Sequence, residues 1–184
     1  RLGYYTNLIT SGVGLTPVRA QKLKDAGLDH VQLSFQDSTK ELNDFLSHTK
    51  TFDLKQRVAK LIKAHDWPMV MNCVLHRHNL PHVRKIIDMA VALEAEYLEL
   101  ANTQYYGWAW VNRDHLMPTH DQLVEAEAVV NRYRARIGNR CQLLFGIAEV
   151  FRQTHTNIYF TIVYRILTCQ FTTYISGNPF RHVM

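Results

Sequence analysis

Apolar runs with strand character alternate with amphipathic stretches over the first 145 residues of the chain. The runs are rich in β-branched, aromatic and aliphatic residues, which is typical of strands. Part of the second run alternates, with Val31, Leu33 and Phe35 on one face. The pattern predicts strands over residues 2–9, 28–35, 69–75, 97–100 and 142–145.

Helix signals lie between these runs. Thr16 and Pro17 form an N-cap followed by a proline at the first helical position, and Gly27 provides the stop. Asn79 and Thr119 are candidate caps for two later helices. The apolar faces of the last three helices are expected at residues 54, 58, 61 and 62; 83, 86, 87, 90 and 91; and 123, 126 and 130. The charged positions 53, 55, 57, 60 and 63 are expected on a solvated helix face.

This order of elements predicts an α/β fold. Strands that alternate with helices form a parallel sheet with right-handed crossovers. The sheet can be doubly wound or part of a (β/α) barrel. The sequence contains neither GxGxxG nor GxxxxGK[ST], so the phosphate-binding loops of dinucleotide and P-loop folds are missing.

Polar residues gather where the predicted strands end. Ligands of parallel α/β folds bind outside the carboxyl ends of the strands, and amides and hydroxyls suit a ribose, an amino-acid head or a peptide backbone. The alternative interpretation is that these residues form turns and helix caps. The positions are Thr6, Asn7, Ser34, Gln36, Asp37, Asn72, residues 76–79 and residues 102–105.

Two further clusters follow the third and fourth of these runs. His76 and His78 have the HxH spacing of some metal sites, although solvated loop histidines explain them as well. Residues 105–110 hold Tyr105, Tyr106, Trp108 and Trp110. These rings either line a cleft for an aromatic or peptide substrate, or pack as a lid.

Composition narrows the class of protein. The 184 residues carry 21 Lys+Arg and 16 Asp+Glu, a formal net charge of +5, without a basic run of the kind that marks a nucleic-acid-binding arm. The three cysteines, Cys73, Cys141 and Cys169, have no disulfide-framework, zinc or iron–sulfur spacing. Such cysteine usage, without a signal peptide, predicts a cytoplasmic protein that binds neither nucleic acid nor membranes.

The composition changes abruptly after residue 145. Residues 146–184 carry four charged side chains and are rich in Thr, Tyr, Phe and Ile. Residues 158–175 have about the length of a membrane span, but Arg165 near the centre is costly in a bilayer, and the β-branched content suits strands. We treat residues 1–145 as one domain and residues 146–184 as a tail of uncertain fold, for instance a frameshifted or truncated end.

Three stretches carry a resemblance to a known family: residues 4–12 (YYTNLITSG), 27–37 (GLDHVQLSFQD) and 98–109 (LELANTQYYGWA). Over residues 2–145 the chain resembles the PqqA peptide cyclases (the PqqE family), radical S-adenosylmethionine (SAM) enzymes with a SPASM-type C-terminal domain. The resemblance implies the later strands of a partial (β/α)6 TIM barrel. It also implies an iron–sulfur oxidoreductase that uses SAM and a [4Fe–4S] cluster to form a carbon–carbon bond between Glu and Tyr of the PqqA peptide, which a PqqD chaperone presents, in pyrroloquinoline quinone (PQQ) biosynthesis.

The resemblance also implies site residues. Asn7, Ser34, Gln36 and Asn72 match positions that meet SAM, and Leu100 matches one that packs near the adenine. Substrate contacts are expected from Gln104, Tyr105, Tyr106 and Trp108.

Two family motifs are missing from this sequence: the CxxxCxxC that ligates the cluster, and GGE. Both are expected upstream of Arg1, so the chain resembles an internal fragment and is expected to be inactive alone. The competing hypotheses are a catalytically silent module that binds a peptide or partner through residues 105–110, and a metal hydrolase that uses His76 and His78.

Overall fold

The computed structural model describes residues 3–145 of the chain. The tail, with the candidate membrane span at residues 158–175, lies outside the described residues. The sheet and its helices belong to one compact unit that begins at Asn7. Within residues 3–145, no helix combines the length and the apolar character that a bilayer crossing requires.

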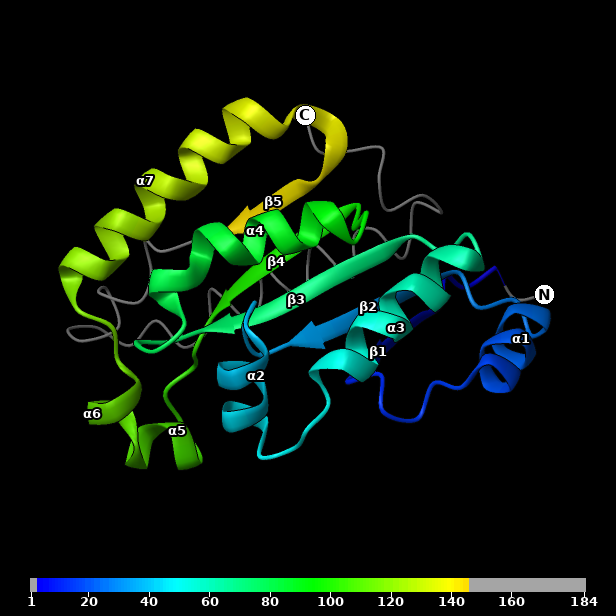
Figure 1. Ribbon diagram of the computed structural model, residues 1–184, viewed down its shortest axis with the longest axis horizontal. Coiled ribbons are helices and arrows are strands. Elements are labelled where there is room, and N and C mark those ends of the chain that lie inside the picture. Colours follow the sequence, from blue (N-terminus) through cyan, green and yellow to red (C-terminus); the bar gives the residue numbers. More distant parts are fainter. Residues whose placement is uncertain (1–2, 146–184) are drawn as a thin grey trace. The chain divides into compact units, whose positions relative to one another are not determined.

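Five parallel strands form one sheet in the order β1-β2-β3-β4-β5 (Figure 1). Sequential order is the arrangement of a (β/α) barrel wall, whereas a doubly wound sheet reverses its order at a switch point. The predicted α/β class and partial barrel are therefore confirmed. The strands are β1 (Asn7–Thr10), β2 (His30–Phe35), β3 (Met69–Leu75), β4 (Tyr97–Asn102) and β5 (Gln142–Phe145).

The first strand differs from its prediction over residues 2–9. It begins at Asn7 and pairs with β2 from Asn7↔His30 to Thr10↔Leu33. It ends where Thr10 Oγ1 accepts a hydrogen bond from the Gly12 amide, which turns the chain toward the first helix. The apolar content of residues 2–9 therefore does not show which of them pair with a neighbouring strand.

Helices connect consecutive strands. Thr16 caps the first one and Thr119 the longest one, as predicted. At Thr119 the side chain of Gln122 completes a reciprocal capping box. Three short α-helices were not predicted: α2 after the second strand, α5 within the aromatic segment, and α6 directly after it. The helices are α1 (Pro17–Asp25), α2 (Lys40–Ser47), α3 (Phe52–Ala64), the 3-10 turn η1 (Leu80–His82), α4 (Val83–Ala92), α5 (Gly107–Val111), α6 (Arg113–Leu116), α7 (His120–Ile137) and the 3-10 turn η2 (Gly138–Arg140).

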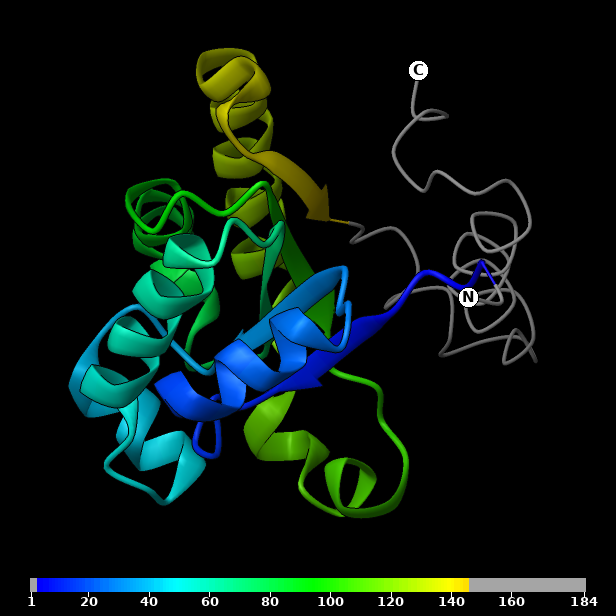
Figure 2. The same cartoon turned by 90° about the vertical axis from the view of Figure 1, so that its right-hand side faces the viewer.

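Helices α1, α3, α4 and α7 cover one face of the sheet (Figures 1 and 2). Because successive side chains of a strand point to opposite faces, each strand sends every second residue into the helix layer. In β2 these are Val31, Leu33 and Phe35, all buried, while Gln32 and Ser34 between them are only partly buried. We call the face that carries Gln32 and Ser34 the open face.

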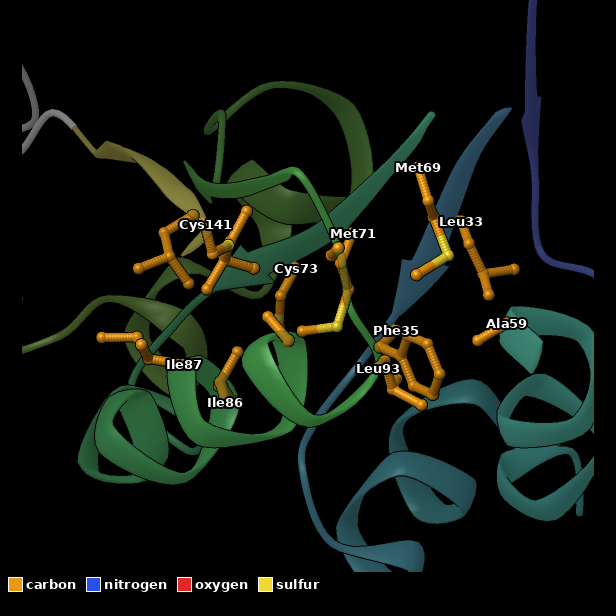
Figure 3. Close-up of a cluster of buried hydrophobic side chains, with 14 of the residues drawn as sticks. Leu33, Phe35, Ala59, Met69, Met71, Cys73, Ile86, Ile87, Leu93 and Cys141 are labelled. Atoms are coloured by element: carbon orange, nitrogen blue, oxygen red, sulfur yellow. The ribbon is translucent and has the colours of Figure 1, made fainter. Parts of the chain in front are cut away.

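The core lies between the sheet and the helices. Met71 and Cys73 of β3 lie toward Ile86 of α4, and Met69 lies beside Leu33 of β2, as Figure 3 shows. Lys55 of α3 is buried here too, with its Nζ 5.7 Å from the centroid of the Phe35 ring. The prediction that this lysine is solvated was wrong, because its long apolar stem packs under an aromatic ring while the charge contacts the π face.

Candidate functional site

The open face carries a row of polar side chains toward the carboxyl ends of the strands. Ser34 of β2 pairs in register with Asn72 of β3, and Asn72 pairs with Glu99 of β4. Gln36 follows β2 directly. The structure therefore brings the predicted site residues Ser34 and Asn72 side by side, because neighbouring parallel strands present equivalent positions next to each other, and Gln36 lies two residues beyond Ser34.

The loop after β2 is held rigidly from both sides. The backbone N–H of Gln36 donates to Oδ1 of Asn43 at 3.0 Å, and its carbonyl accepts from Nδ2 of Asn79 at 2.8 Å. Both asparagines are fully buried. Such contacts fix the backbone that carries the Gln36 side chain, which is the support that a preorganised site requires.

Asn79 lies at the N-cap position of η1, where the sequence predicts a cap, but its side chain makes no cap hydrogen bond. Instead its Nδ2 also donates to the Val74 carbonyl at 2.8 Å, and its Oδ1 accepts from the His76 amide at 2.8 Å. The residue ties the end of β3 to the end of β2, a long-range role that the local sequence does not indicate.

Asp37, the next residue, also stabilises the loop after β2. It is fully buried, and both its carboxylate oxygens lie near Nδ1 of His82, at 3.0 and 3.1 Å. Its Oδ2 also accepts from the Thr39 amide at 2.8 Å. A buried carboxylate needs such partners, because removing one from water is costly.

Several polar groups in this row remain available to a ligand. Among the described residues, no hydrogen bond uses the hydroxyl of Ser34, the side-chain amide of Gln36 or Oδ1 of Asn72. All three residues are partly exposed. The row thus presents a hydroxyl, a free amide and an amide oxygen, groups that suit hydroxyl and amino-acid functions.

Two residues of the row were missed by the sequence reasoning, Gln32 and Glu99. Nδ2 of Asn72 donates to Oε2 of Glu99 at 2.7 Å, and Nε2 of Gln32 donates to the same oxygen at 3.2 Å. The signal that could have found Glu99 is its parity: it lies between Leu98 and Leu100, both buried, so it must point to the open face.

Asn7 and Leu100 lie elsewhere. Asn7 begins β1 and pairs with His30, the first residue of β2, so it lies at the amino edge, about 13 Å along the strands from the level of Ser34. Its Oδ1 is buried and has no hydrogen-bond partner within the described part of the chain. Leu100 is 2% exposed and belongs to the helix-covered core, so the structure does not bring it to the open face.

The histidine cluster does not assemble a metal site within residues 3–145. There, no group of three His, Cys, Asp or Glu side chains is arranged to hold an ion. The rings of His76 and His78 are 5.5 Å apart, and Nδ1 of His76 accepts from the His78 amide at 3.2 Å. Burial, followed by the neighbouring His78, lowers the pKa of His76 to about 4, which keeps its ring neutral.

The aromatic segment at residues 105–110 forms a projecting turn and the short helix α5. Tyr105 is half-buried, and burial raises the pKa of its hydroxyl. Gln104, Tyr106, Trp108 and Trp110 are exposed, Trp108 by 82%. Arg77 anchors the adjoining helix α6 by donating to the carbonyls of Asp114 and Met117 at 2.9 and 2.8 Å. The exposed rings of this segment therefore adjoin a helix whose position is fixed by Arg77.

The cysteines of the described region do not fit an iron–sulfur cluster. Cys73 points into the helix layer and is fully buried, and burial raises the pKa of its thiol to about 12 (Figure 3). Burial likewise raises the pKa of the Cys141 thiol to about 11. Because cluster ligands are thiolates, neither residue is suited to that role.

Comparison with known proteins gives both a family match and structural neighbours. The model of the Radical SAM superfamily matches residues 1–90. The chain is similar in fold to Streptococcus suis SuiB bound to S-adenosylmethionine, with 15% identity and a TM-score of 0.62, over 79% of this chain and 34% of that one. SuiB has also been solved bound to its precursor peptide SuiA, and there the identity is 14% and the TM-score 0.60, over 78% and 33% of the chains.

A second protein shows the same fold. The structure of hexahistidine-tagged anSMEcpe with bound AdoMet has 19% identity and a TM-score of 0.62, over 76% of this chain and 40% of that one. The chain spans between a third and two fifths of the length of these structures.

Proposed function

We propose that this chain is part of an enzyme that modifies a peptide. The premises are that residues 1–90 match the Radical SAM superfamily and that the fold is one found in radical SAM enzymes. The observation that carries the proposal is the row of free polar groups on the open face. The neighbours support the substrate class, because SuiB was solved with a precursor peptide.

The finer proposal is a PqqA peptide cyclase. Its support is the resemblance of residues 4–12, 27–37 and 98–109 to that family. The reaction is then the cross-linking of Glu and Tyr of the PqqA peptide in PQQ biosynthesis, with PqqD as the presenting partner. SAM bound to a [4Fe–4S] cluster supplies the radical chemistry of such enzymes. The described residues do not fit the cluster, so no step is assigned to it.

The residues do fit SAM. The Ser34 hydroxyl and the Asn72 amide oxygen lie side by side on adjacent strands and suit the ribose hydroxyls. The free amide of Gln36, on a backbone fixed by Asn43 and Asn79, suits the amino-acid head. Asn7 and Leu100 belong to the family pattern, but the structure places them away from this row.

Ligand binding by the 184-residue chain tests this assignment. We expect S-adenosylhomocysteine to bind in titration calorimetry, and Asn72→Ala to weaken binding about tenfold, the loss expected for a hydrogen bond in a site built for it. Asn131→Ala, an exposed asparagine of α7, is the matched control and leaves binding unchanged. No binding, or binding that Asn72→Ala does not weaken, contradicts the proposal.

Cluster assembly gives a separate test. The sequence has no CxxxCxxC. We expect anaerobic reconstitution of this chain with iron and sulfide to give neither bound cluster nor 5′-deoxyadenosine from SAM. A clear signal in both the iron and the 5′-deoxyadenosine assay contradicts the expectation that the chain alone is inactive.

The second candidate function is a silent peptide- or partner-binding module. The exposure of Tyr106, Trp108 and Trp110 favours it, because exposed aromatic clusters mark interaction surfaces. Binding of a PqqA-type peptide that Trp108→Ala abolishes, without any binding of S-adenosylhomocysteine, supports this alternative over the enzyme. Binding of both ligands supports the enzyme.

A further inference from the structure

Two amide side chains from adjacent strands converge on one carboxylate of the open face. Gln32 of β2 and Asn72 of β3 both donate to Oε2 of Glu99 on β4, at 3.2 and 2.7 Å. All three residues are partly buried, so a ligand on the open face can still reach them. We call these residues the Glu99 cluster.

The carboxylate decides which way the two amides face. An ionised carboxylate only accepts hydrogen bonds, so each amide must turn its NH₂ group toward Glu99. The opposite flip would set an amide oxygen against the carboxylate. Oδ1 of Asn72 and Oε1 of Gln32 therefore point away from Glu99. The cluster thus presents hydrogen-bond acceptors to a ligand, and the orientation of both amides is fixed.

Glu99 has little structural work of its own. Among residues 3–145 its carboxylate forms no ion pair and accepts no hydrogen bond from a backbone N–H. Glu96, three residues earlier, is the contrast: it pairs with Lys63 and accepts the Met69 amide at 2.7 Å. A partly buried carboxylate without a cation does not favour folding, so its stabilising role is small.

We propose that Glu99 is a positioning residue that fixes the Asn72 and Gln32 amides and thereby makes the site select a ligand with hydroxyl donors. The proposal rests on the proposed function for the identity of that ligand, a nucleoside whose ribose carries two neighbouring hydroxyls. Ser34, level with Asn72, completes the row with a hydroxyl that both donates and accepts. The negative charge of the cluster disfavours a phosphate at the same position.

The first test needs no ligand. In the isotopically labelled 184-residue chain, the side-chain NH₂ signals of Asn72 and Gln32 report their bond to the carboxylate. We expect the Asn72 proton that faces Glu99 to be shifted downfield, and Glu99→Gln to remove that shift. Glu127→Gln, at an exposed position of α7, is the matched control. An Asn72 signal that Glu99→Gln leaves unchanged overturns the proposal.

The second test measures selectivity with adenosine and 3′-deoxyadenosine. We expect the wild-type chain to prefer adenosine about five- to tenfold, and Glu99→Gln to reduce this ratio, because the Asn72 amide oxygen is then no longer held toward the ligand. In an Asn72→Ala background the same substitution should no longer change the ratio. A purely structural role would weaken both nucleosides equally.

The outcomes separate the two proposals. Binding with an unchanged ratio in Glu99→Gln overturns the positioning role and leaves the proposed function standing. No binding of either nucleoside overturns the ligand selection, and the binding of S-adenosylhomocysteine, measured separately, decides the proposed function. A ratio that falls in Glu99→Gln, and that stays constant in the Asn72→Ala background, supports the inference.

Discussion

Gly12 is fixed by both its backbone and its neighbours. Its φ is +84°, and a Cβ there would lie 3.0 Å from Cδ1 of Leu33 and 3.2 Å from Cγ1 of Val58. Gly12→Ala therefore combines left-handed strain with a clash in the core, and we expect a loss of about 2–4 kcal/mol in the free energy of unfolding. Urea denaturation followed by circular dichroism measures it.

Gly107 is the control for Gly12. It also has a positive φ, +54°, but nothing lies within 4 Å of its missing Cβ. Gly107→Ala therefore tests the backbone strain alone, and a cost of about 1 kcal/mol is expected. Equal losses in the two variants would show that the contacts with Leu33 and Val58 contribute nothing.

His76 makes the stability of the fold depend on pH. Its pKa is lowered from 6.5 to about 4 by burial and by His78, while the buried Asp37 opposes the shift. The unfolded chain takes up a proton near pH 6.5 and the folded one does not, so stability falls as the pH drops from 6.5 toward 4, by at most about 1.4 kcal/mol per pH unit. At higher pH both states are neutral and the effect vanishes.

The measurement compares the free energy of unfolding at pH 7 and pH 5. His76→Gln should lose less stability between these two values than the wild type. His115→Gln, at an exposed position, should behave like the wild type. If the loss is the same with and without His76, this histidine is not a source of the acid sensitivity.

At the residue scale, the sequence predicts types of residue better than their partners. Polar strand ends pointed to Ser34, Gln36 and Asn72, which the sheet register brings together. The roles of Asn79 and of Glu99 depend on residues 43 and 27 positions away, Gln36 and Asn72, and no local pattern encodes such distances. Asn79 and Glu99 reach these partners only when the strands pair.

The positions of strands relative to one another depend on the same long-range hydrogen bonds. A substitution of Asn79, which joins the ends of β2 and β3, tests this. Asn79→Asp keeps the shape of the side chain but replaces the donor to the Gln36 and Val74 carbonyls by an oxygen. Two buried acceptors then face a buried carboxylate, so we expect a loss of about 2–5 kcal/mol in the free energy of unfolding.

The same urea experiment on Asn131→Asp provides the control, because Asn131 is exposed on α7. A change below about 0.5 kcal/mol is expected there, as at most surface positions. An Asn79→Asp variant as stable as this control would show that the buried amide does not join the two strand ends.

The alternation of apolar runs and amphipathic stretches predicted the strands that end at Phe35, Leu75 and Phe145, since burial imposes a period on the sequence. Short helices and strands contain too few repeats of this apolar pattern to be predicted from it. Helix α2 has eight residues and α5 has five, and β1 is defined only by the four residues that pair with β2. Pairing, rather than apolar content, sets such limits.

The two edges of the sheet differ in the contacts that their polar side chains make. At the amino edge, Glu96 joins α3 to β3 through Lys63 and the Met69 amide, and its carbonyl accepts the Gln142 amide of β5 at 2.8 Å. The free polar groups of Ser34, Gln36 and Asn72 lie toward the other edge. In parallel α/β folds the carboxyl edge binds ligands, and the amino edge contributes stability.

If the proposed site lies at the carboxyl edge, two substitutions should have opposite effects. Glu96→Ala should lower the free energy of unfolding by about 1–3 kcal/mol, because the Met69 amide and Lys63 lose their partner, and should change the affinity for S-adenosylhomocysteine less than twofold. Asn72→Ala should weaken that affinity about tenfold at a cost of less than about 1 kcal/mol in stability, since Glu99 keeps its bond from Gln32. Urea denaturation and calorimetry on both variants measure the two quantities. If Glu96→Ala weakens binding as much as Asn72→Ala does, the edges are coupled, and the ligand site extends through the sheet rather than lying at its carboxyl edge.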